Sequence, residues 1–132
     1  MTVSPRPLSI LVVEDDAEFR HCIQMLLKRT PHRVVAAGDA ATAIQFLQEC
    51  SFDVVLTDML IGDRDGSEVI AATRMNQPNA RIVAMSGGST MFRPSYCLTQ
   101  AIAWGAAEPL MKPFSFDQLM AALENHPVAV AA

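Results

Sequence analysis

The segment LSILVVED, residues 8–15, is the strongest indication of the fold of this chain. Four aliphatic residues run from Ile10 to Val13 and are followed directly by two carboxylates, Glu14 and Asp15. A continuous apolar run of this kind is typical of a strand that is covered on both faces of a parallel sheet. The acidic pair at its end is therefore expected at the carboxyl edge of the sheet, where open α/β sheets bind their ligands.

Three later apolar runs also end on a polar residue. They are residues 54–57, which stop at Asp58, residues 82–85, which stop at Ser86, and residues 110–111, which stop at Lys112. If these runs are neighbouring parallel strands, their carboxyl ends meet at one edge of the sheet. Three carboxylates, a hydroxyl and an amine are then expected in one place.

Strand and helix patterns alternate along the whole chain. Strands are expected at residues 9–13, 33–37, 53–57, 81–85 and 107–111. Helical spacing of apolar residues follows each strand, and helices are expected at about residues 16–29, 40–47, 67–75, 95–104 and 115–125. Strict alternation predicts a parallel sheet with right-handed crossovers and helices on both faces.

Pro109 indicates the order of the strands. Proline cannot donate a hydrogen bond to a sheet, so it belongs on an edge strand or at a bulge. In the flavodoxin-like order 2-1-3-4-5 the fifth strand is an edge, and the most apolar runs, one, three and four, lie inside. We therefore predict a flavodoxin-like (βα)5 three-layer α/β sandwich. It forms a single domain over residues 1–132, with a core of about 8–125 and a loose tail at 127–132.

Composition excludes several classes of function. The chain has 132 residues, 51% of them hydrophobic and 18% charged, which is ordinary for one soluble globular domain. A formal net charge of −4 argues against direct nucleic-acid binding and against an anionic membrane surface. Neither a signal peptide nor a membrane-spanning run is recognisable, so a cytoplasmic location is expected.

The cysteines and histidines form no recognisable metal or disulfide motif. The cysteines are odd in number, lack CxxC spacing and are expected to be reduced and buried: Cys22, Cys50 and Cys97. The histidines are scattered and are expected at the surface: His21, His32 and His126.

The acidic edge predicts a site for a divalent cation. Three carboxylates brought within a few ångströms would raise at least one pKa unless a cation compensates. Oxygen ligands with room for water suit Mg²⁺. We expect Asp15 and Asp58 to bind it directly, and Glu14 to bind it directly or through water.

Ser86 and Lys112 add the features of a phosphoryl site. A hydroxyl can hydrogen-bond one anionic oxygen and an ammonium can neutralise another. A carboxylate can act as the nucleophile and form an aspartyl phosphate. Asp58 is the candidate acceptor, because it follows a central strand and opens the loop 59–66, whose backbone amides are expected to cradle the phosphoryl oxygens.

Four strings resemble the receiver domain of two-component response regulators. They occur in the family's order and spacing over nearly the whole chain: ILVVEDD (10–16), DVVLTDMLIGDRDG (53–66), IVAMSG (82–87) and LMKPF (110–114). The resemblance implies that Asp58 accepts a phosphoryl group from a histidine kinase or histidine phosphotransfer protein, with Mg²⁺ as cofactor. The chain would then be no enzyme in the ordinary sense, since it assists only its own phosphorylation and dephosphorylation.

The same resemblance assigns the other site residues. Glu14 and Asp15 are implied as the acidic metal pair, Ser86 as the switch hydroxyl and Lys112 as the invariant amine. The backbone carbonyl of Leu60 is implied to complete the metal shell, and the bond between Lys112 and Pro113 to be cis. Phosphorylation is implied to switch the surface of the fourth helix, fifth strand and fifth helix.

The chain departs from the family where the signal is read out. Pro109 stands where the family usually has a Tyr or Phe that swings inward, so we expect the signal to leave through the loop after Ser86 and the fourth helix. The segment 86–96 is longer than in the family, and its Met91 and Phe92 either contact a partner or fold back on the core. Trp104 lies on the expected partner face.

Two alternative functions follow from the same residues. Pro109 favours a receiver-like interaction module that works independently of phosphorylation. A flavodoxin-like cofactor binder is disfavoured, because the acidic run 14–16 would repel an anionic cofactor and no phosphate-cradling glycine loop opens the first helix. The downstream protein is not identifiable from the sequence, and a monomer or a weak phosphorylation-dependent dimer is expected.

Overall fold

The computed structural model describes residues 6–61, 64–86 and 108–124. Its main sheet has five parallel strands in the order β2-β1-β3-β6-β7. They are β1 (Ser9–Val13), β2 (Arg33–Ala37), β3 (Val54–Asp58), β6 (Arg81–Ser86) and β7 (Glu108–Met111). Because β6 and β7 are the fourth and fifth strands of this sheet along the chain, the predicted order 2-1-3-4-5 is confirmed.

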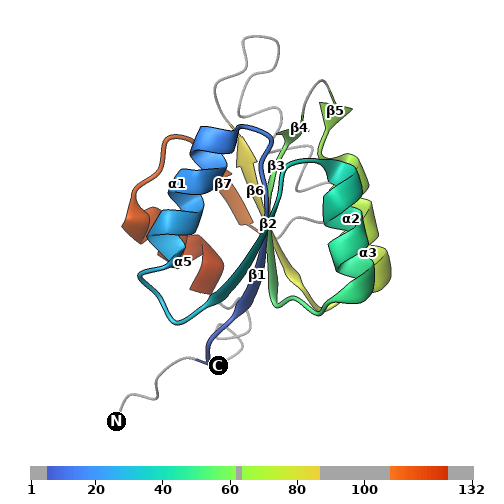
Figure 1. Cartoon of the computed structure of the whole chain (residues 1–132), viewed down its shortest axis with the longest axis horizontal. Coiled ribbons are helices and arrows are strands. Elements are labelled where there is room, and N and C mark those ends of the chain that lie inside the picture. The colour runs from blue at the N-terminus through green and yellow to red at the C-terminus, as the bar shows by residue number, and fades with distance from the viewer. Residues whose placement is uncertain (1–5, 62–63, 87–107, 125–132) are drawn as a thin grey trace.

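Helices cover both faces of the sheet, which gives three layers. In Figure 1, α1 and α5 lie on one side, and α2 and α3 lie on the other. Their bounds are α1 (Ala17–Leu27), α2 (Ala40–Glu49), α3 (Ser67–Asn76) and α5 (Phe116–Glu124). The helix expected at 95–104, the tail 127–132 and the residues Met91, Phe92, Cys97, Trp104 and His126 lie outside the described residues.

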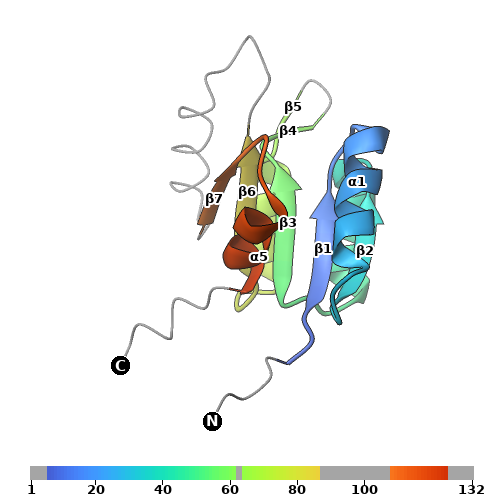
Figure 2. The same ribbon diagram turned by 90° about the vertical axis from the view of Figure 1, so that its left-hand side faces the viewer.

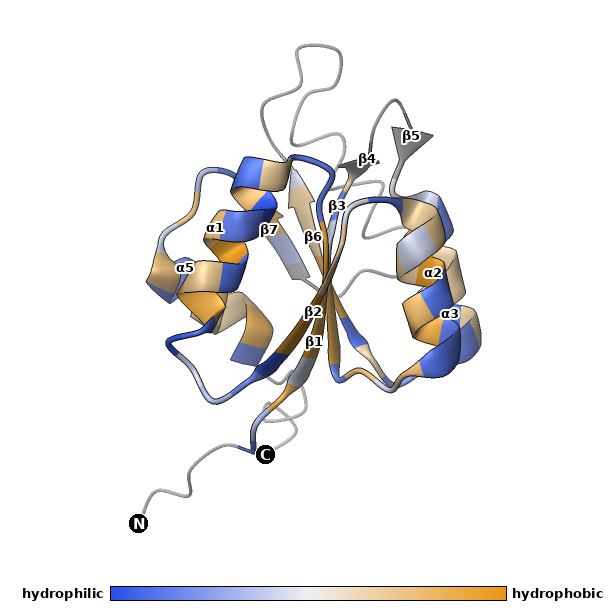
Figure 3. Ribbon diagram, in the orientation of Figure 1, coloured by the Kyte–Doolittle hydropathy of each residue, from blue (hydrophilic) through white to orange (hydrophobic). Residues whose placement is uncertain are grey.

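Strand β1 contributes to both hydrophobic cores. Ile10 and Val12 pack on the side of α1 and α5, while Leu11 and Val13 pack on the side of α2 and α3. All four are completely buried, as expected for a central parallel strand. In Figure 3 the central strands are coloured hydrophobic, and the helices carry both hydrophobic and hydrophilic colour.

Acidic caps start the first two helices. The Asp16 side chain accepts hydrogen bonds from the Glu18 and Phe19 N–H groups at 3.0 and 3.2 Å, so Asp16 caps α1. Asp39 caps α2 by accepting from the Thr42 N–H at 2.7 Å, and this backbone bond lowers the pKa of Asp39.

Strand β7 is an edge strand, as Pro109 predicts. Figure 2 shows β7 at one side of the sheet, with β6 as its neighbour. Pro109 is exposed and lies opposite Ala84 in the register of the two strands. The missing N–H of proline therefore costs no hydrogen bond to a further strand.

The segment after β3, expected as a loop, contains a small hairpin. Strands β4 (Leu60–Ile61) and β5 (Arg64–Asp65) pair antiparallel, with Leu60 opposite Asp65. The Met59 carbonyl accepts from the Gly66 N–H at 2.7 Å and closes the hairpin at its base. Strands of two residues are too short to leave a periodic pattern, which is why the sequence did not reveal them.

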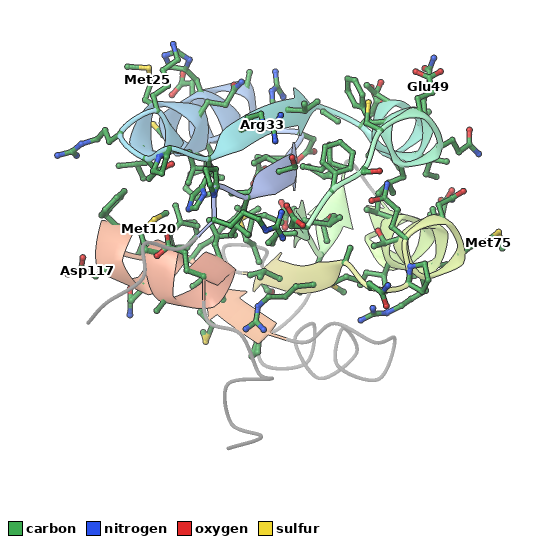
Figure 4. All side chains as sticks on the ribbon, turned by 90° about the horizontal axis from the view of Figure 1, so that it is seen from below. Met25, Arg33, Glu49, Met75, Asp117 and Met120 are labelled. Carbon is green, nitrogen blue, oxygen red and sulfur yellow. The ribbon has the colours of Figure 1, made fainter. Side chains whose placement is uncertain are left out.

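The prediction that the cysteines are buried is wrong for the two that the structure describes. Cys22 and Cys50 are exposed. The buried stripe of α1 is centred on Ile23 and Leu27, which leaves Cys22 at the margin of that stripe, and Cys50 lies beyond the last turn of α2 as its C-cap. Met25 on α1 and Met75 on α3 also project outward (Figure 4).

The prediction that His32 lies at the surface is also wrong. Its side chain is buried, with Nδ1 accepting from the Leu8 N–H at 2.9 Å and Nε2 lying 2.7 Å from Glu124 Oε2. His21, in contrast, is exposed as expected. His32 lies in a connecting segment, where hydrophobic periodicity carries no information about burial.

Among the helices that the structure describes, none has the length and apolar character needed to cross a membrane.

Candidate functional site

The carboxyl ends of the parallel strands lie at the top of Figure 2, and three carboxylates come together at this edge of the sheet. Glu14 and Asp15 follow β1, and Asp58 ends β3, its neighbour in the sheet. One oxygen from each of these three side chains lies within 4.8 Å of the other two. The clustering that the sequence predicts is therefore present in the structure.

Glu14 is the most buried of the three carboxylates. Only 1% of its surface is exposed, and this desolvation raises its pKa to about 7 against the opposing hydrogen bond from Lys112. Glu14 Oε1 accepts from Lys112 Nζ at 2.7 Å, and Oε2 accepts from the Asp16 N–H at 3.1 Å. Both oxygens of Glu14 are thus held in fixed directions.

Lys112 bridges two of the carboxylates. Its Nζ also donates to Asp58 Oδ2 at 3.2 Å. Burial alone would lower the pKa of Lys112, but the hydrogen bond to Glu14 and the charge of Asp58 outweigh it and raise that pKa. Lys112 therefore remains a cation beside Asp58 and can neutralise an anion that arrives there.

Ser86 ends β6 beside the same cluster. It is buried, and its carbonyl accepts from the Lys112 N–H at 2.8 Å. The neighbouring Met85 carbonyl accepts from the Met59 N–H at 2.9 Å, which ties the end of β6 to the segment after Asp58. These backbone hydrogen bonds keep Ser86, Lys112 and the segment after Asp58 next to one another at the carboxyl edge of the sheet.

Two further residues of the predicted set have definite positions. Leu60 begins β4, two residues after Asp58. Pro109 lies on the exposed edge strand, three residues before Lys112. The bond between Lys112 and Pro113 is cis, which confirms the expectation from the resemblance.

Gly66 packs against the backbone of Asp58, a contact that the sequence did not indicate. A Cβ atom built at Gly66 would lie 2.6 Å from the Asp58 carbonyl oxygen. Its φ of −84° is ordinary for any residue, so it is space and not backbone conformation that requires glycine here.

Arg20 and Phe19 also reach the site from α1. Arg20 Nη1 donates to the Glu14 carbonyl at 2.9 Å, and the Phe19 ring lies over Lys112 Nζ, 4.5 Å from its centroid. Neither contact is indicated by the sequence pattern. Which side chain of a helix reaches across to a neighbouring loop depends on how the elements pack.

The donor set fits a hard divalent cation. It offers three carboxylate oxygens close together, of the kind that Mg²⁺ prefers, and no nitrogen or sulfur ligand in the described cluster. Asp15 is exposed, so one side of the cluster faces solvent and is accessible to water and to phosphate oxygens.

Comparison with known proteins identifies the family. The response regulator receiver domain matches residues 10–124. The chain is 30% identical over 117 residues to the DNA-binding transcriptional regulator NtrC of Azospirillum brasilense, an alignment that covers 89% of this chain and 24% of the relative. It is also 30% identical over 118 residues to the transcriptional regulatory protein ZraR of Escherichia coli K12, with 89% and 26% covered. The chain thus spans about a quarter of the length of these two relatives.

Solved structures agree with this assignment. A crystal structure of a response regulator protein from Burkholderia pseudomallei, with a phosphorylated aspartic acid, calcium ion and citrate, matches with a TM-score of 0.78 and 26% identity, over 93% of this chain and 69% of that chain. Full-length FixJ from B. japonicum matches with a TM-score of 0.79 and 28% identity, over 94% and 62%. The chain belongs to the family of response regulator receiver domains, which serve two-component signalling systems.

Proposed function

We propose that Asp58 is the phosphoacceptor of this receiver and that a histidine kinase or a histidine phosphotransfer protein is the donor. The observation that carries the proposal is the position of the Asp58 carboxylate, 3.2 Å from the Lys112 ammonium and inside a cluster of three carboxylates. A carboxylate beside a fixed cation can receive a phosphoryl group whose negative charge would otherwise be repelled. The phosphorylated aspartic acid in the Burkholderia pseudomallei relative supports the same chemistry.

The transfer exchanges one bond to phosphorus for another. An Asp58 oxygen forms a bond to phosphorus while the bond between phosphorus and the donor histidine nitrogen breaks. The electron pair of the broken bond stays with the imidazole, which takes up a proton from solvent and ends neutral. In the later hydrolysis, water attacks phosphorus, inorganic phosphate leaves and the Asp58 carboxylate is restored.

Glu14, Asp15, Asp58 and the Leu60 carbonyl are the proposed ligands of Mg²⁺. When bound, Mg²⁺ offsets the negative charge that the carboxylates and the phosphoryl oxygens bring together. Support comes from the carboxylate oxygens of Glu14, Asp15 and Asp58, which lie within 4.8 Å of one another. A cation bound between them would offset the repulsion among three negative charges.

Lys112 and Ser86 are proposed to act on the phosphoryl group itself. The Lys112 ammonium, already beside Asp58, donates to one phosphoryl oxygen, and the Ser86 hydroxyl donates to another. Both residues lie at the ends of adjacent strands, so their backbones are fixed by the sheet. The protein thus acts on its own side chain and turns over no separate substrate.

The output is proposed to be a protein contact made by the fourth helix, β7 and α5. Pro109 has no rotamer that could swing inward, so the signal is proposed to leave through the segment after Ser86, with Met91, Phe92 and Trp104 as candidate contacts. The relatives are transcriptional regulators, but the net charge of −4 argues against nucleic-acid contact by this chain itself. A cytoplasmic monomer or weak phosphorylation-dependent dimer completes the proposal.

The test is phosphorylation by a small acyl phosphate in the presence of Mg²⁺, read by intact mass. The chain should gain one phosphoryl group, and Asp58→Asn should gain none. Asp39→Asn is the matched control, since Asn caps a helix as well as Asp and residue 39 lies outside the carboxylate cluster. A full mass gain in Asp58→Asn would disprove the assignment. If a partner binds equally well with and without phosphorylation, the alternative function, a phosphorylation-independent interaction module, is favoured instead.

A further inference from the structure

The Lys112 ammonium is held from three directions. Two are carboxylates, Glu14 at 2.7 Å and Asp58 at 3.2 Å. The third is the ring of Phe19, whose centroid lies 4.5 Å from Nζ. With all three contacts, only 17% of the Lys112 side chain remains exposed. Among the described residues that contact this cation, Phe19 supplies a neutral group.

The Phe19 ring contacts a second aromatic ring, and the Phe19 backbone is anchored by the helix cap. The ring of Phe114 meets it edge-on, with centroids 5.7 Å apart and an angle of 72° between the planes. The backbone N–H of Phe19 donates to the capping carboxylate of Asp16 at 3.2 Å. One support comes from the segment that follows β7 and the other from the start of α1. The contact with Phe114 and the anchored backbone together restrict how the ring that faces Lys112 can turn.

A ring face attracts a cation without competing for its protons in the way that a carboxylate does. The quadrupole of the ring favours an ammonium within about 6 Å of the centroid, and the attraction strengthens when water is excluded. Lysine has a flexible four-carbon stem and a strongly hydrated head, so it needs such a constraint more than arginine does. The Phe19 face restricts Nζ while leaving its N–H groups available to oxygen acceptors.

We propose that Phe19 is a positioning residue for phosphoryl transfer, which holds the Lys112 ammonium against Asp58 before the phosphoryl group arrives. The inference rests on the proposed function. The attraction between the ring face and the cation is distinct from the packing of an apolar side chain. Leucine would fill much of the same space without attracting a cation. An aromatic residue at position 19 is thus required for a full rate of phosphorylation, and not only for packing.

The test compares Phe19→Leu with Phe19→Tyr in phosphorylation by a small acyl phosphate at saturating Mg²⁺. Phe19→Leu should react roughly three- to tenfold more slowly than the wild type, in keeping with the strength of a partly shielded cation–π contact. Phe19→Tyr should restore the rate to within about twofold, since Tyr offers a comparable ring face. Phe46→Leu is the matched control, because Phe46 packs against the core on the opposite face of the sheet. An unchanged rate in Phe19→Leu overturns the proposal.

A second measurement needs no phosphorylation. The nitrogen-15 and proton resonances of the Lys112 ammonium, assigned by their loss in Lys112→Arg, should be shifted by the ring current in the wild type and in Phe19→Tyr. The shift should disappear in Phe19→Leu. If it is the same in all three proteins, the contact is absent and the proposal fails.

The two measurements separate this inference from the function on which it rests. A wild type that takes up no phosphoryl group defeats the proposed function, whatever the ring-current result. A wild type that takes up the group at the same rate as Phe19→Leu defeats only the role of Phe19.

Discussion

Replacement of glycine by alanine is expected to have different effects at two positions of this fold. Gly66→Ala places a Cβ 2.6 Å from the Asp58 carbonyl, so the backbone of β3 or of α3 must move. We expect a loss of about 1–3 kcal/mol in the free energy of unfolding, the usual cost of overpacking. Phosphorylation of Asp58 should slow as well, because the shifted atoms belong to the acceptor itself.

Gly38→Ala is the control for that prediction. Its Cβ would lie 2.9 Å from Arg20 Nη1, the far end of a flexible side chain that can move aside. Urea unfolding should therefore show a smaller loss for Gly38→Ala than for Gly66→Ala. Equal losses in the free energy of unfolding for the two variants would contradict the conclusion that Gly66 packs against the Asp58 backbone.

His32 is a buried polar residue whose bonds predict a purely structural role. Because Nδ1 accepts from the Leu8 N–H, the ring proton sits on Nε2 and is donated to Glu124. His32→Ala leaves the buried Leu8 N–H without this partner and should cost about 1–3 kcal/mol in urea unfolding. The phosphorylation rate of the folded fraction should stay unchanged. A slower rate at equal folded fraction would mean that His32 also acts on the site.

Asp53 joins the starts of two strands. It precedes β3, and its Oδ2 accepts from the Ser9 N–H of β1 at 2.9 Å, while Arg6 Nη2 donates to its Oδ1 at 3.0 Å. Burial would raise the pKa of Asp53, but the hydrogen bonds from Ser9 and Arg6 prevail and lower it. The carboxylate form thus stabilises the pairing of β1 with β3.

This lowered pKa predicts a specific acid sensitivity. The contribution of Asp53 is fully present above its unfolded pKa, near 3.9, and is lost as the pH falls through its lower folded pKa. Since Arg6 is largely exposed, solvent screening keeps the contribution below about 1 kcal/mol. Asp53→Asn should therefore be less stable than the wild type at neutral pH and should lose less stability between about pH 4 and pH 2. Parallel pH profiles of urea unfolding for the two proteins would contradict this.

The proposed Mg²⁺ site exists only in the folded chain. Its carboxylates come from the ends of β1 and β3, which are distant in sequence, so the unfolded chain has no equivalent site. A ligand that binds only the folded state stabilises it, by about 1.4 kcal/mol at ten times its Kd. For a domain of this size we expect Tm to rise by roughly 3–6 °C at that concentration.

Asp15→Asn tests whether that rise belongs to the carboxylate cluster. The variant should lose most of the Mg²⁺-dependent increase in Tm, and addition of a chelator should lower the wild-type Tm without affecting the variant. Asp39→Asn, outside the cluster, should keep the full increase in thermal scans. A rise that persists in Asp15→Asn would place the ion elsewhere.

Much of the architecture follows from local pattern. The uninterrupted apolar residues of β1 predict burial on both faces, Pro109 predicts an edge strand, and the alternation of strands and helices restricts the topology to a parallel sheet. The predictions of burial and of secondary structure fail where the local sequence pattern carries no information. His32 lies in a connection, Cys22 lies at the margin of a helical stripe, and the strands β4 and β5 are too short to show a period.

The fold and the residues proposed for the site can be predicted from the sequence, because strand ends in a parallel sheet share one edge and Glu14, Asp15, Asp58, Ser86 and Lys112 each end or follow a strand. How those groups are held becomes visible only in the folded chain. Glu14 becomes the most deeply buried carboxylate, Gly66 closes on the Asp58 backbone, and Phe19 reaches Lys112. Burial, close approach and ring contacts depend on the packing of segments distant in sequence, which no local pattern encodes.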